Sequence, residues 1–160
     1  RGAERARVSG ITNLEYVIGD ASAIAEGGRL SPDIVVALHA CGGLSDVALG
    51  FAAKHGASFC VCMCCFKRNR ELRVGGVGIP EWLGVPAERL QAACSIAALT
   101  SDLTASARGM HAVGAIRAEA IQRHWRSVAP LGNANAGGFI PDGVRVRLVR
   151  FPRRFSLCNL

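Results

Sequence analysis

Histidine, cysteine and paired glycines follow two apolar runs of this chain, and they are its most chemically capable residues. The first run, residues 33–38, continues into His39-Ala40-Cys41-Gly42-Gly43, and the second run, residues 57–66, carries the pair Cys64-Cys65 near its end. An imidazole accepts a proton near neutral pH, and a thiolate is a nucleophile and a ligand for soft metals. The two segments therefore predict a site at which a histidine accepts a proton or a cysteine acts as a nucleophile or metal ligand.

Both runs predict strands that are buried on both faces, as in a parallel sheet, because they are continuous and end at turn residues. The amphipathic residues 44–56 between them are long enough for a crossover helix. Open α/β sheets place their ligands beyond the carboxyl ends of parallel strands. We therefore expect a cleft where the two cysteine-bearing segments end.

The remaining elements are expected to surround this sheet. A short strand at 14–18 leads into Gly19-Asp20-Ala21, and the cysteines at 60 and 62 are expected to be buried apolar residues of the second strand. Helices are expected at 3–8, at 47–54 with a cap at Ser45 or Asp46 and an end at Gly56, at 87–99, and at 103–125 after an Asp102 cap. Loops are expected over the cleft at 74–85 and at the surface at 131–143. A strand at 144–148 and a hairpin partner after Pro152 are expected to complete the chain.

Three stretches resemble a known family. NLEYVIGDA at 13–21, PDIVVALHACGGLSDVAL at 32–49, and GAS at 56–58 with the later Cys-Cys are similar to the second half of a class I S-adenosylmethionine (SAM)-dependent methyltransferase domain. The branch that the chain resembles has one strand ending in HACG and the next ending in PCC. It includes the methyltransferase domain of glutathione S-transferase C-terminal-domain-containing protein and the CHHC-zinc-finger tRNA methyltransferases. Met63 stands where that branch has proline.

The resemblance implies an α/β fold with a partial Rossmann-like sheet, comprising strands three to seven, flanking helices and a C-terminal antiparallel hairpin. Residues 1–160 are then expected to form one truncated domain. No glycine-rich turn precedes Asp20, although the family's first strand carries one that cradles the cofactor. We therefore expect this fragment by itself to bind SAM poorly and to be inactive.

The resemblance also implies cofactor contacts at Gly19, Asp20, Ala21, Leu38 and His39. Asp20 holds the position that contacts the adenine amino group in the family, although an aspartate after a strand can instead cap the next turn. His39 could accept a proton from the substrate, or it could fix its loop by a hydrogen bond. Cys41 is the second candidate catalytic residue.

The expected acceptor side of the cleft comprises the Cys64-Cys65 pair and the basic segment that follows it. Cys64 and Cys65, with Lys67, Arg68 and Arg70, are the candidate substrate-binding residues. With Cys41 and His39 the cysteine pair could form a tetrahedral zinc site. Adjacent cysteines on one strand point to opposite faces, however, so we expect thiols without a bound metal.

Composition narrows the class of protein. The net charge of +7 comes from seventeen arginines and two lysines, which fits an anionic partner such as RNA, although an arginine-rich proteome would produce the same bias. The seven cysteines are odd in number and four of them lie in or beside one strand, which favours reduced thiols in a cytoplasmic or organellar protein over a secreted disulfide framework. No apolar run is long enough to span a bilayer.

The resemblance therefore implies a SAM-dependent methyltransferase domain that transfers a methyl group to an oxygen, nitrogen or sulfur nucleophile, with RNA as one candidate acceptor. An alternative is a noncatalytic module that keeps the fold and binds RNA or a partner.

Overall fold

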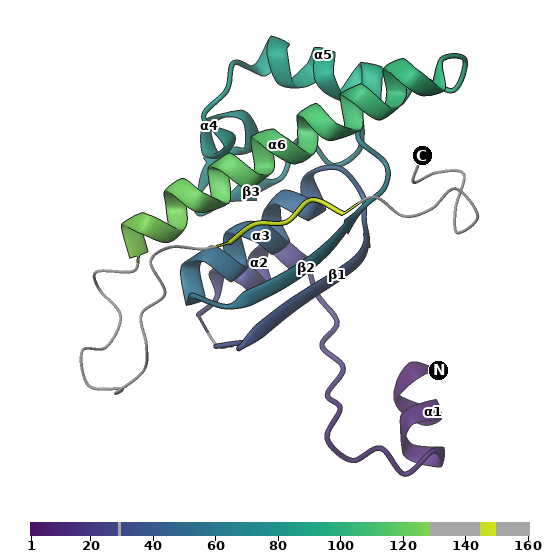
Figure 1. The fold of residues 1–160 in the computed structure, drawn as a ribbon. Coiled ribbons are helices and arrows are strands. Elements are labelled where there is room, and N and C mark those ends of the chain that lie inside the picture. Colours follow the sequence, from purple (N-terminus) through teal and green to yellow (C-terminus); the bar gives the residue numbers. More distant parts are fainter. Residues whose placement is uncertain (29, 129–144, 150–160) are drawn as a thin grey trace.

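Helices and strands alternate along the first half of the chain, and helices dominate the described part of the second half. The computed structural model describes residues 1–28, 30–128 and 145–149 (Figure 1). Its elements are α1 (Gly2–Val8), α2 (Ala21–Glu26), β1 (Ile34–Ala40), α3 (Gly43–His55), β2 (Ser58–Met63), β3 (Arg73–Val74), β4 (Val77–Gly78), α4 (Ile79–Leu83), α5 (Ala87–Ala97) and α6 (Leu103–Val128). The expected mixed α/β architecture is confirmed.

The predicted strand pair and its crossover helix are present. β1 and β2 are parallel, with Ile34 beside Ser58, and α3 contacts both strands. Gly56 ends α3 in the left-handed conformation at φ +63°, as its sequence position predicts. The carboxyl ends of β1 and β2 therefore lie next to each other, and so do the segments that follow them.

One face of this small sheet is open, contrary to the expectation of strands buried on both faces. The side chains of Ile34, Val36 and Leu38 are 63%, 71% and 71% exposed. Cys60 is exposed and Cys62 is half-buried, so the prediction that both are buried is wrong. Within the described residues, β1 pairs with β2 alone, and no described helix shields these side chains from solvent.

Two further predictions, for a strand at 14–18 and for the start of the helix after β1, are wrong. Residues 14–18 form no strand, because no described segment offers them a ladder partner, and Ile18 is fully exposed at 101%. α3 begins at Gly43 and not at residue 47, so Ser45 and Asp46 lie in its first turn and do not cap it. The helix expected at 3–8 is confirmed as α1.

The stretch at 74–85, expected as a loop, is a hairpin followed by a helix. β3 and β4 are joined by Gly75 and Gly76, whose φ angles of +59° and +80° suit a tight hairpin turn. α4 then buries Ile79, Trp82 and Leu83 in the main core. Two-residue strands are too short to show an alternating pattern, which explains why the sequence did not predict them.

α5 and α6 confirm the two expected helices; α6 packs against α3, and α5 packs against α6 (Figure 1). The Asp102 carboxylate caps α6 by accepting hydrogen bonds from the backbone N–H groups of Thr104 and Ala105, each 2.9 Å long. Val113 and Ile121 of α6 are completely buried. The carboxyl end of β1 is therefore enclosed by α3 and α6.

The carboxyl-terminal predictions are tested only in part. Residues 145–149 belong to no strand, although Val146 packs against the core. The loop at 131–143 and the hairpin partner after Pro152 lie outside the described residues. Among the described helices, none combines the length and apolarity that a membrane crossing requires.

Candidate functional site

A bulge at the end of β1 sets the position of Leu38 and His39, two of the five residues expected to contact the cofactor. Ala37 pairs with Val61 but Ala40 pairs with Met63, so Leu38 and His39 together oppose one residue of β2. His39 has φ +57°, which is uncommon for a residue other than glycine. Both side chains are exposed as a result. Bulges of this kind often re-aim side chains beside functional sites.

The two segments beyond the strands press against each other. The Gly43 N–H donates to the carbonyl oxygen of Arg68 at 3.1 Å, and the Asn69 amide nitrogen donates to the carbonyl oxygen of Cys41 at 2.8 Å. A Cβ added at Gly42 would overlap the Arg68 carbonyl oxygen, and one added at Gly43 would overlap that of Asn69. The absence of a side chain at these two glycines therefore allows the neighbouring loop to approach closely.

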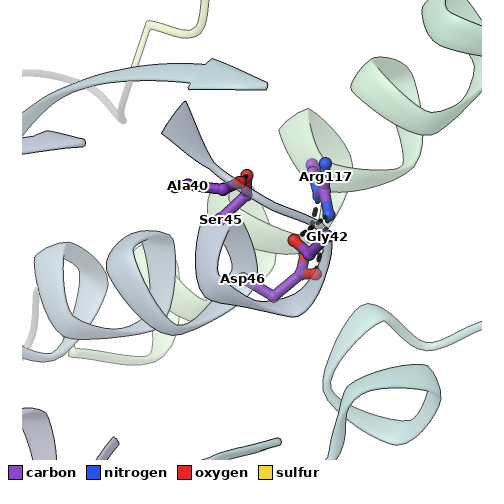
Figure 2. A network of polar contacts seen from close by, with 5 residues as sticks. All are labelled: Ala40, Gly42, Ser45, Asp46 and Arg117. Atoms are coloured by element: carbon purple, nitrogen blue, oxygen red, sulfur yellow. Dashed lines mark hydrogen bonds and ion pairs between the residues drawn. The ribbon is translucent and has the colours of Figure 1, made fainter. Parts of the chain in front are cut away.

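A buried ion pair between α3 and α6 fixes the loop that follows β1. Arg117 of α6 donates through Nε to Asp46 Oδ1 at 2.7 Å and through Nη2 to Asp46 Oδ2 at 2.8 Å, as Figure 2 shows. The same Nη2 donates to the Gly42 carbonyl oxygen at 2.9 Å. Ser45 Oγ donates to the Ala40 carbonyl oxygen at 2.5 Å. The segment from Ala40 to Gly42 is therefore held by α3 and α6, and not by a hydrogen bond from His39.

Sequence reasoning missed this pair, although a signal was available. Arg117 lies one helical turn after Val113 and one turn before Ile121, on the stripe of α6 that packs inward. A charged residue on such a stripe requires a buried partner, since an unpaired charge is costly to bury. Asp46, in an otherwise apolar stretch of α3, was the available acid on the facing helix.

Three predicted site cysteines converge at the junction of the loops. The sulfur atoms of Cys41, Cys64 and Cys65 all lie within 4.8 Å of one another, and Cys41 Sγ is 3.0 Å from Cys64 Sγ. The expectation that Cys65 points away from Cys64 is therefore wrong. β2 ends at Met63, so strand alternation does not extend to the pair.

The pKa values of the Cys41 and Cys64 thiols shift in opposite directions. Hydrogen bonds from Cys64, and then from Cys65, lower the pKa of the Cys41 thiol. Burial, and then the hydrogen bond to Cys41, raise the pKa of the Cys64 thiol to about 12. Of these two thiols, Cys41 therefore loses its proton more readily than Cys64.

Asp20 caps the helix that follows it. Its Oδ1 accepts hydrogen bonds from the N–H groups of Ser22 at 2.8 Å and Ala23 at 3.1 Å, and Ala21 is the first residue of α2. Its exposed position leaves the carboxylate accessible to solvent. The capping role, one of the two alternatives for this residue, is thus present in the structure.

The basic residues of the second loop face solvent. Lys67, Arg68 and Arg70 are exposed, and Arg70 lines a hollow of about 190 Å³ beside Gly42. Arg73 differs, because its Nη1 donates to the Gly76 carbonyl oxygen at 2.7 Å. A larger hollow of about 420 Å³ lies elsewhere, between α2, α3, the β3–β4 hairpin and the end of α6. Arg73, the last residue of the basic segment, lines this larger hollow, and none of the predicted site residues from Gly19 to Arg70 does.

Comparisons with known proteins bear on the first part of the chain. No curated protein and no solved structure matches the chain. Residues 3–71 match a family model described as a methyltransferase domain. All the predicted site residues, from Gly19 to Arg70, fall within the matched segment. The match therefore supports a methyltransferase domain in residues 3–71 and methyl transfer as its general chemistry.

Proposed function

We propose that the chain is part of a SAM-dependent methyltransferase of the branch with an HACG strand, and that it methylates an anionic acceptor such as RNA. The observation that carries the proposal is the meeting of two loops. The His39–Gly43 and Cys64–Arg70 segments pack together beyond adjacent parallel strands, where open α/β sheets bind ligands. Both segments lie inside the region that matches a methyltransferase domain.

The proposed cofactor side comprises the turn before α2 and the bulge of β1. SAM, when bound, supplies an activated methyl group on a sulfonium. Asp20 accepts a hydrogen bond from the adenine amino group while continuing to cap α2, since a carboxylate has several acceptor sites. Gly19 and Ala21 flank it, and Leu38 and His39 present exposed side chains that suit contact with the cofactor.

The proposed acceptor side comprises the cysteine cluster and the basic residues beyond it. His39 accepts the proton that an oxygen, nitrogen or sulfur nucleophile loses, because its imidazole is exposed at the loop entrance. Cys41, Cys64 and Cys65 line this side. Alignment of the two reactants contributes most of the rate, so no stronger acid or base is required. The reduced thiols favour a cytoplasmic location.

Asp20 offers a test that separates capping from cofactor binding. Asp20→Ala should weaken SAM binding by about 1–3 kcal/mol through the lost hydrogen bond, and should also destabilise α2 by about 1 kcal/mol. Asp20→Ser keeps a good cap but withdraws the carboxylate, so it should weaken SAM binding alone. Calorimetric titration with SAM and thermal unfolding of the complete protein measure the two effects. Unchanged SAM affinity in both variants would assign Asp20 to capping only.

The basic segment offers a test of the acceptor class. Replacing Lys67, Arg68 and Arg70 together with alanine should weaken RNA binding and lower the slope of log affinity against log salt by about 2, because each neutralised phosphate releases counterions. A triple alanine variant at three exposed arginines on α5 and α6 removes the same charge and serves as the control: Arg89, Arg108 and Arg126. Equal salt slopes in the two variants would contradict an RNA contact at this loop.

The activity itself is tested by transfer of a tritium-labelled methyl group from SAM to cellular RNA by the complete protein. Labelling of RNA by the parent protein, with less label transferred by the Asp20→Ser variant, supports the methyltransferase function. RNA binding with neither SAM binding nor label transfer would instead establish the noncatalytic module.

A further inference from the structure

Three thiols from two loops share one small volume. Among the described residues, Cys41, Cys64 and Cys65 are the only group of three or more side chains placed to hold a metal ion together. Cys41 and Cys64 are half-buried, whereas Cys65 is exposed. The cluster is therefore both gathered by the fold and open to an ion arriving from solvent.

The loops that carry these thiols are fixed by contacts other than the thiols themselves. Asn69 ties the second loop to the Cys41 carbonyl oxygen, and Arg117 ties the first loop to α6 through the Gly42 carbonyl oxygen. A ligand set held in this way binds an ion at a lower entropic cost than a mobile one.

The distances fit a tetrahedral soft ion. Zinc–sulfur bonds of about 2.3 Å place two thiolates about 3.8 Å apart. The Cys41–Cys64 sulfur distance is 3.0 Å and the other two lie within 4.8 Å, so shifts of about 1 Å or less bring all three pairs to the required spacing. The sequence argument against zinc assumed that Cys64 and Cys65 diverge along a strand, and they do not.

We propose that Cys41, Cys64 and Cys65 bind one Zn²⁺ ion as thiolates, with the fourth coordination position open to solvent. Three protein ligands and one open position are the arrangement of catalytic zinc, whereas structural zinc has four protein ligands. Binding releases the thiol protons. The three thiolates and the ion carry a net charge of −1, which the exposed Lys67 and Arg68 in the same loop offset. The inference does not depend on methyl transfer.

The test uses Co²⁺ and Zn²⁺ with the reduced, chelator-treated protein under nitrogen. One equivalent of Co²⁺ should produce a thiolate-to-cobalt charge-transfer band in the near ultraviolet, and one equivalent of Zn²⁺ should abolish it. Cys65→Ala and Cys41→Ala should each weaken Co²⁺ binding at least about tenfold, as losing a first-sphere ligand exceeds the usual effect of losing an outer-sphere partner. Cys60→Ser, on the open face of β2, is the control and should bind Co²⁺ like the parent.

Cys65 is exposed, so its replacement should leave the fold intact, and circular dichroism verifies this. Absence of the charge-transfer band in the reduced parent protein overturns the zinc site. A band that persists at full strength in Cys65→Ala overturns the three-thiolate set. A protein that takes up no metal but forms a Cys41–Cys64 disulfide in air, seen as a loss of two mass units, also overturns it in favour of a redox pair.

Discussion

Replacing Arg117 with methionine is expected to lower the free energy of unfolding by about 3–5 kcal/mol. The substitution leaves the Asp46 carboxylate, which is 1% exposed, without its bidentate partner, and it also removes the donor to the Gly42 carbonyl oxygen. Domains typically have 5–15 kcal/mol of stability, so this single change removes a large share of it. Urea unfolding followed by circular dichroism measures the loss.

Two further variants show whether burial of the ion pair causes the loss. The double variant Asp46→Leu with Arg117→Met removes both charges and should recover part of the stability, because no unpaired charge remains buried. Arg7→Met removes the exposed Glu4–Arg7 pair, whose side chains are 63% and 74% exposed, and should leave the free energy of unfolding nearly unchanged. A loss in Arg117→Met no larger than that in Arg7→Met would show that the buried pair contributes no more than a surface pair.

Gly42→Ala is expected to be the second most damaging change, at about 2–5 kcal/mol. Gly42 has φ +56°, which strains any other residue, and its new Cβ would overlap the Arg68 carbonyl oxygen. Because that carbonyl also accepts the Gly43 N–H, the contact between the two loops should open. Binding of Co²⁺ by the cysteine cluster should then weaken together with stability.

Two other glycines separate the causes of this effect. Gly75→Ala meets open space at φ +59°, so it introduces the backbone strain alone, about 1–2 kcal/mol. Gly43→Ala makes its new Cβ overlap the Asn69 carbonyl oxygen, and this should lower the free energy of unfolding by about 1–3 kcal/mol. Thermal unfolding ranks the three variants. If Gly42→Ala is no more destabilising than Gly75→Ala, the loops do not press together as the structure indicates.

Local patterns in the sequence determined the central strand pair, its crossover helix and the two long helices. Gly56 and Asp102 marked helix ends correctly, because capping depends on the few residues nearest to a helix terminus. The same patterns placed His39, Cys41 and the Cys64-Cys65 pair beyond adjacent parallel strands. The meeting of these two segments at one edge of the sheet was therefore predictable from local patterns.

Tertiary structure alone decided how those residues meet. Asp46 and Arg117 are 71 positions apart, so only the packing of α6 on α3 reveals their pairing. The convergence of Cys64 and Cys65 depends on where β2 stops, which is set by its pairing with the bulged end of β1. Long-range contacts fix both features, and no local window of sequence contains both partners of such a contact.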